Sequence, residues 1–133
     1  MSMEKSPEER LAEVVRADGR YPLEAFALLH DGLERAVRGV YGEKSESKGT
    51  HHVSGAQLSW ALRDEAVERW GLLAPRVLAK WNIRATLDFG NMVYLLVDNE
   101  LMSKTDQDSL EDFRDVFAFS DAFGPETVFG GGP

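Results

Sequence analysis

The stretch from Leu78 to Val97 constrains the fold more than any other part of the chain. Its sequence, LAKWNIRATLDFGNMVYLLV, is typical of the end of one helix, a short polar turn and the start of a second helix. From Met92 to Val97 this second helix is apolar all round, so we expect it to lie in the centre of a core. The run VYLLV also has the composition of a buried strand, which is the alternative structure for it.

Two more helices have starts that the sequence specifies directly. Ser6 is followed three residues later by Glu9, and Ser54 is followed at the same spacing by Gln57. In such a pair each side chain can bond the other residue's backbone N–H, which is the arrangement called a capping box. We therefore expect one helix to begin just after Ser6 and another just after Ser54.

A further helix is expected to begin at Tyr21-Pro22. Apolar or ring-bearing residues recur along it at spacings of four, three, four and three, which predicts one buried stripe; they are Phe26, His30, Leu33, Val37 and Val40. Within this stripe His30 is expected to be a core histidine with its ring N–H satisfied. The polar run GEKSESKGT at 42–50 predicts a flexible connection.

The remaining segments complete a mainly helical prediction. A helix is expected over 72–81, with Leu73 and Leu78 on its apolar face, and Thr86 is expected to cap the helix that follows. Residues 101–119 can form a helix capped by Asp108 and Glu111, or a small β-hairpin. The chain 1–133 is thus predicted to be a single helical domain of about five helices with a helix-turn-helix-like pair, a small C-terminal hairpin as an alternative, and a loose tail at 130–133.

Charge is distributed unevenly along the chain. The net charge is −8, and residues 100–121 contain seven acidic and only two basic residues. Such a surface repels phosphate backbones and anionic membranes and attracts basic proteins. The predicted interaction surface for a basic protein partner consists of Asp106, Asp108, Glu111, Asp112 and Asp115.

The order helix, turn, helix and then a hairpin also suggests a winged-helix nucleic-acid-binding regulator. Direct readout of bases needs hydrogen-bond donors near the start of the second helix. Arg84 is the one cation at that place, and the segment in the position of a wing is strongly acidic. Because phosphate neutralisation is a major part of DNA binding, this function is an alternative and not the main prediction.

His51 and His52 raise a third alternative, a metal-dependent enzyme that uses these adjacent histidines. The chain has no HxH, HxxxH or HExxH spacing and no cysteine, so any further ligand would be a distant carboxylate. The acidic run from Asp106 resembles a calcium loop but has Glu111 where the required glycine would stand. No cofactor is expected, because the sequence contains neither a phosphate-binding loop nor a dinucleotide fingerprint.

Four stretches carry a family resemblance when they are taken together: HVSGAQL at 52–58, APRVLAKWNI at 74–83, TLDFG at 86–90 and DSLEDFRDVFAF at 108–119. They resemble a family of short uncharacterised bacterial proteins found mainly in planctomycetes and verrucomicrobia, over residues 20–123. The resemblance implies no activity, ligand or catalytic residue. In that family glycine often follows the tryptophan of the second stretch; here the residue is Asn82, which can also adopt a left-handed turn conformation.

The recurring positions of this pattern can be interpreted as fold-building. They are His52, Ser54, Gly55, Trp81, Thr86, Asp88, Phe89, Gly90, Asp108, Asp112 and Phe113. Asp88 suits the positive end of a helix, Gly90 permits close approach of another segment, and Asp108 and Asp112 can tie the last segment to the body.

The predicted function is therefore that of a non-catalytic, cytoplasmic protein-binding or regulatory module. The longest apolar run is too short to cross a bilayer, and the first ten residues, MSMEKSPEER, do not form a secretory signal.

Overall fold

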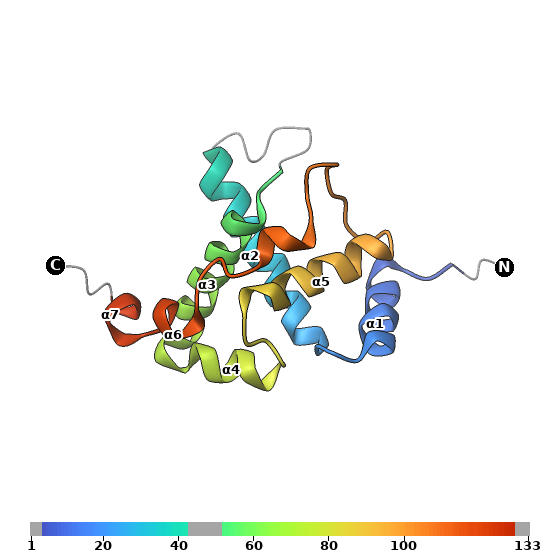
Figure 1. Cartoon of the computed structure of the whole chain (residues 1–133). Helices are drawn as coiled ribbons and strands as arrows, with labels where there is room; N and C mark the ends of the chain where they lie inside the picture. Colours follow the sequence, from blue (N-terminus) through green and yellow to red (C-terminus); the bar gives the residue numbers. More distant parts are fainter. Residues whose placement is uncertain (1–3, 43–51, 130–133) are drawn as a thin grey trace.

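The computed structural model describes residues 4–42 and 52–129 and confirms a mainly helical fold of about five main helices (Figure 1). The main helices are α1 (Pro7–Asp18), α2 (Leu23–Tyr41), α3 (Gly55–Trp70), α4 (Ala74–Lys80) and α5 (Thr86–Asp98). Four short helical turns complete the described part: η2 (Gly71–Leu73), η3 (Leu110–Phe113), α6 (Phe119–Ala122) and α7 (Pro125–Val128). Their buried apolar side chains form one core.

The two predicted capping boxes are both present. The Ser6 hydroxyl accepts from the Glu9 N–H at 3.1 Å, and the Ser54 hydroxyl accepts from the Gln57 N–H at 3.0 Å. In each box the longer side chain also accepts from the backbone N–H of the serine. Helices α1 and α3 therefore begin where the sequence predicts.

Helices α2 and α3 pack against each other along their length and form the centre of the fold (Figure 1). The contact is close because Gly32 faces Leu62: a Cβ added at Gly32 would overlap the Leu62 side chain. The other buried residues of α2 are Ala25, Phe26, Leu28, Leu29 and Ala36. Small residues on α2 thus leave room for the larger side chains of α3.

The predicted stripe on α2 was wrong in part. The His30 side chain is 72% exposed and pairs with Glu34, so it is not a core histidine, and Val40 is also exposed. In the segment 72–81, Leu78 on α4 is buried as predicted, whereas Leu73, in the turn η2, is exposed. The stripe is displaced because Gly32 and Ala36 face α3, and small residues contribute little to a hydrophobic pattern.

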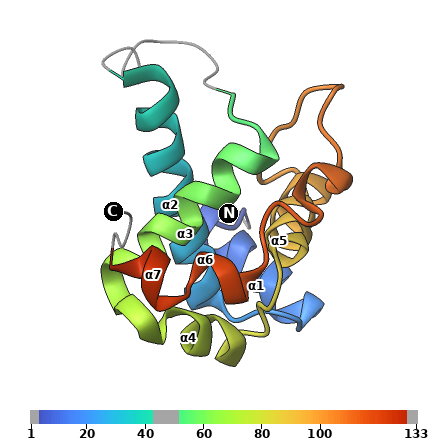
Figure 2. The ribbon, with the colours of Figure 1, turned by 60° about the vertical axis from the view of Figure 1, so that its left-hand side comes forward.

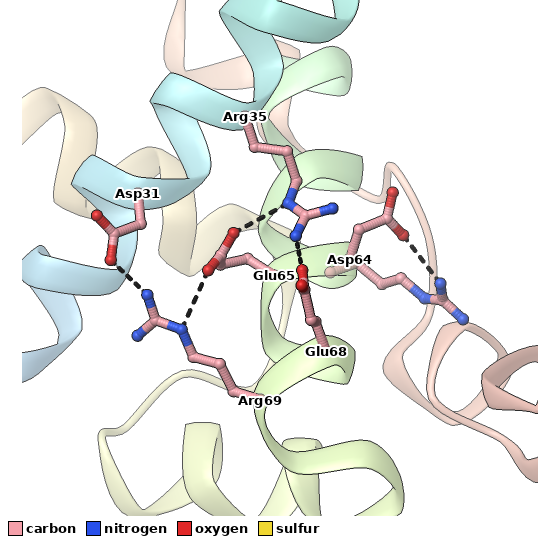
Figure 3. Close-up of polar contacts among 7 residues, drawn as sticks. Asp31, Arg35, Asp64, Glu65, Glu68 and Arg69 are labelled. Atoms are coloured by element: carbon pink, nitrogen blue, oxygen red, sulfur yellow. Dashed lines mark hydrogen bonds and ion pairs between the residues drawn. The ribbon is translucent and has the colours of Figure 1, made fainter.

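A network of ion pairs joins the exposed edges of α2 and α3 (Figure 3). Glu65 lies at its centre: its two carboxylate oxygens bind Arg35 Nε at 2.9 Å and Arg69 Nε at 3.1 Å. Arg35 also pairs with Glu68, and Arg69 with Asp31. The network therefore links α2 to α3 along the exposed edge of their apolar contact.

Helix α5 forms where the sequence placed its second helix, so the strand alternative for VYLLV is wrong. It is not covered all round: Met92, Val93 and Leu96 are buried, while Tyr94 and Leu95 are half-buried. The turn before it contains Asn82 with φ of 66°, which is the left-handed conformation expected at this position.

Thr86 does not cap α5 as predicted. Ala85 is the N-cap residue, and the Asp88 carboxylate accepts from the Arg84 N–H at 2.8 Å and the Ala85 N–H at 3.1 Å. The Thr86 hydroxyl is instead fully buried. It donates to the Phe113 carbonyl at 2.6 Å and accepts from the Val116 N–H at 3.1 Å, and so fastens the later segment to α5.

Residues 101–119 contain no strand, so the hairpin alternative does not form, and the helical alternative is limited to the short turn η3. Its start is held by Asp112, which accepts from the Ser109 N–H at 2.9 Å, and not by Glu111. Phe113 from this turn packs over Gly90, where an added Cβ would lie 2.8 Å from it. Gly90 therefore permits the expected close approach.

The C-terminal turns α6 and α7 lie over α3 and next to α4 (Figure 2). Phe123 is buried in the core, and the Arg63 Nε on α3 donates to the Ala122 carbonyl at 2.9 Å. The predicted connection at 42–50, apart from Gly42, and the predicted loose tail at 130–133 lie outside the described residues. Among the described helices, none combines the length and the apolar character needed to span a membrane.

Candidate functional site

The predicted acidic surface borders a cavity of about 140 Å³. The cavity lies between the N-terminus of α3, the middle of α5 and the segment 102–113, with Leu33 of α2 at its side. Its apolar lining includes Leu58, Val93, Met102 and Phe113, and its polar lining includes His52, Tyr94, Lys104, Asp108 and Asp112. Two of the five predicted acidic residues and one of the two predicted histidines therefore converge here.

His52 is held at the cavity by two contacts. Its Nε2 lies 3.0 Å from an Asp108 carboxylate oxygen, and its backbone carbonyl accepts from the Tyr41 hydroxyl. The other Asp108 oxygen accepts from the Thr105 N–H at 2.7 Å. Asp108 therefore joins the loop to His52, two residues before the α3 capping box, and ties the last segment to the body.

Asp112 lies directly against the start of α3. A Cβ added at Gly55 would be 3.0 Å from the Asp112 backbone carbonyl oxygen and from its Cβ. A carboxylate near a helix N-terminus is stabilised by the free N–H groups and the positive end of the helix dipole. The first residue of α3 must be small for this approach to occur.

Tyr94 reports the electrostatic character of the cavity. Burial raises the pKa of its hydroxyl, and the negative charges of Asp108, Asp112 and Asp98 raise this pKa further. Sequence reasoning missed Tyr94 because it stands inside an apolar run, where its ring suggested core packing alone. The cavity thus combines an apolar wall with two carboxylates, and Lys104 also lies in its lining.

The other three predicted acidic residues lie on the exposed part of the same segment. Asp106, Glu111 and Asp115 are exposed, as is Asp112 at the edge of the cavity, whereas Asp108 is half-buried. Arg114 binds Glu111 with its Nε at 2.7 Å and lowers the pKa of that carboxyl group. Asp115 has a φ of 50°, a conformation that aspartate tolerates better than most residues.

In the described part of the chain, no group of three metal-ligand side chains includes His52. His51 lies outside the described residues, and His52 has one carboxylate partner. Within residues 4–42 and 52–129, three ligand atoms come within 4.8 Å of one another at His30, Asp31 and Glu34. These side chains stand on one surface turn of α2, and Asp31 is already paired with Arg69.

The helix–turn–helix order of α4 and α5 is confirmed, but the start of α5 is covered. Thr86 is fully buried beneath the segment that contains η3. Asn91 donates to the Tyr21 hydroxyl at 3.2 Å, and Arg84 donates to the Asn82 side chain at 2.6 Å. The residues that would read bases on a recognition helix therefore have partners within the protein.

Comparisons of this chain with protein-family models, with curated proteins and with solved structures found no match.

Proposed function

We propose that the protein is a non-catalytic protein-binding or regulatory module that binds a basic segment of a partner protein. The contact is the acidic surface, defined as Asp106, Asp108, Glu111, Asp112 and Asp115. The observation that carries the proposal is the cavity of about 140 Å³ beside this surface, with Asp108 and Asp112 in its lining. The proposal places the protein in the cytoplasm. Disulfides are typical of secreted proteins, and this chain contains no cysteine.

The cavity suits the side chain of lysine or arginine. One water occupies about 30 Å³ in the liquid, so the cavity can hold several waters or one long side chain. The stem would lie along Val93 and Met102, and the cationic head would meet the carboxylates. A charge-assisted hydrogen bond is stronger than a neutral one, and salt screens it less in a partly enclosed site than on an open surface.

The remaining acidic residues serve a different purpose in this proposal. Asp106, Glu111 and Asp115 are exposed, so each contributes little to affinity by itself. Together they attract a basic segment and raise its association rate. Specificity for one cationic side chain then comes from the cavity, and the long-range attraction comes from the exposed loop.

The test is a titration with a labelled peptide in which one lysine or arginine is flanked by further basic residues. Replacement of Asp108 and Asp112 by Asn keeps an oxygen for the backbone N–H groups that they accept from, so the loop should retain its structure. We expect the Kd of this double variant to rise about tenfold. Glu126→Gln, on α7 and away from the cavity, is the control and should leave the Kd unchanged.

Tyr94 supplies a second readout. A cation in the cavity opposes the carboxylates, so saturation with a tyrosine-free basic peptide should lower the Tyr94 pKa. Ultraviolet absorption against pH measures this change, and Tyr94→Phe identifies the signal. Equal binding by the double variant and the wild type, or a Tyr94 pKa that saturating peptide leaves unchanged, would reject the proposal.

A further inference from the structure

A second surface of the protein has the opposite charge to the acidic surface. It is a groove of about 470 Å³ between the end of α1, the connection at 19–22 and the end of α4. Its lining includes Arg16, Arg20, Leu23, Lys80, Trp81 and Asn82. Three of these residues are cations and none is acidic, although the chain carries 23 acidic and 15 basic residues. This basic groove lies away from the cavity and shares no lining residue with it.

Two of the three cations of the basic groove are available for a ligand. Arg16 and Lys80 are exposed, and no carboxylate within the described part of the chain pairs with either. Arg20 is held in place by Asp18, with its Nε 3.1 Å from a carboxylate oxygen, and it lies 5.5 Å from the centre of the Tyr21 ring. This pairing fixes the guanidinium in one orientation and neutralises part of its charge.

The floor of the groove is also held in place. The Asn82 side chain donates to the Arg20 carbonyl at 3.2 Å, which joins the end of α4 to the connection at 19–22. Trp81 packs edge-on against Trp70 with ring centroids 5.4 Å apart. Leu23 is an exposed large apolar residue at the edge. Aromatic residues and arginine are enriched at protein–protein interfaces, and cations beside an apolar floor complement a peptide with acidic and apolar residues.

We infer that the basic groove binds a short acidic segment of a partner protein, in which Asp or Glu flanks an apolar side chain. The carboxylates would meet Arg16, Arg20 and Lys80, and the apolar side chain would lie on Leu23 and Trp81. A nucleic acid suits the groove less well. It carries one phosphate charge for about every 1.7 Å of duplex, so it would extend beyond three cations onto a protein of net charge −8.

The experiment uses the full chain and fluorescence anisotropy. The probe is a labelled peptide with Glu and Asp on both sides of one Leu, and the comparison peptide has Gln and Asn in their place. Arg16→Gln combined with Lys80→Gln should raise the Kd of the acidic peptide about three- to tenfold, because each exposed charge pair contributes little by itself. Arg76→Gln, on α4 but outside the groove lining, is the matched control and should leave the Kd unchanged.

Circular dichroism of the three proteins confirms that they are equally folded. Binding of the acidic peptide that falls in the double variant and persists in Arg76→Gln supports the inference. The inference is overturned if the neutral peptide binds as well as the acidic peptide, or if Arg76→Gln weakens binding as much as the double variant. It is also overturned if a single-stranded oligonucleotide of the same charge binds more tightly than the acidic peptide. The acidic-surface variants do not touch this groove, so the two proposals fail or succeed separately.

Discussion

At the scale of single residues, two positions on α5 decide where the C-terminal third of the chain lies. Thr86 bonds the backbone on both sides of Arg114 through one hydroxyl, and Gly90 leaves room for Phe113. A methyl group at Gly90 would meet the Phe113 side chain at 2.8 Å, closer than van der Waals contact allows. These two residues therefore hold η3 against α5, and η3 in turn places Asp112 at the cavity.

Tyr21 makes the stability of the protein depend on pH. Burial and its hydrogen bond to Asp88, at 2.7 Å, raise its pKa from 10.0 to about 12. The folded protein therefore holds this proton more tightly than the unfolded chain. The stabilisation is complete below pH 10 and is lost as the pH rises through about 12, because the unfolded state releases its proton first.

Tyr21→Phe isolates this effect. Near neutral pH we expect the variant to be about 1 kcal/mol less stable, because Asp88 and Asn91 lose a buried partner. As the pH rises from 10 towards 12 the two proteins should converge, since the variant lacks this proton. Urea unfolding at a series of pH values measures the stability difference at neutral pH and its decrease above pH 10. If the two stability curves stay parallel from pH 10 to 12, Tyr21 is not the group that causes the pH dependence.

At the scale of elements, the ends of helices were easier to predict than their faces. A capping box is a local arrangement of two side chains and the backbone, so Ser6 and Ser54 act as the sequence indicates. Which face of a helix is buried depends on the helix that packs against it. On α2, the small residues Gly32 and Ala36 are buried, whereas His30 and Val40 are exposed. The ion pairs of Figure 3 then secure the edge of the same contact.

Glu65→Gln tests the contribution of that network. The Glu65 side chain is 15% exposed and is shared by Arg35 and Arg69, so loss of its charge should cost about 1–2 kcal/mol of unfolding free energy. Glu68→Gln is the matched control, because Glu68 is 66% exposed and bonds Arg35 alone; its cost should be below about 0.5 kcal/mol. Tryptophan fluorescence in urea reports both values, and equal costs would show that Glu65 has no central role.

At the scale of the whole molecule, charge is separated into an acidic surface and a basic groove on a chain of net charge −8. A large net charge favours solubility but destabilises the compact state through repulsion between like charges. The excess of negative charge in residues 100–121 adds to this repulsion, and these charged side chains do not contribute to the core. We interpret it as a stability cost that is maintained for binding.

Salt should therefore stabilise the protein. Screening of the acidic surface should outweigh the weakening of exposed ion pairs, which contribute about 0–1 kcal/mol each, so the urea midpoint should rise from low to high NaCl. Neutralisation of Asp106, Glu111 and Asp115 to Asn, Gln and Asn should raise the midpoint at low salt and reduce its response to salt. A midpoint that falls with NaCl would show that the ion pairs dominate.

The sequence by itself determined the helical class, the starts of α1 and α3, the left-handed turn at Asn82 and the acidic character of 100–121. Each of these depends on neighbours within a few residues or on composition. Only the tertiary structure decided the face of α2, the role of Thr86, the grouping of His52, Tyr94, Asp108 and Asp112 around one cavity, and the basic groove. Those features join residues far apart in the chain, and local periodicity does not specify which faces meet.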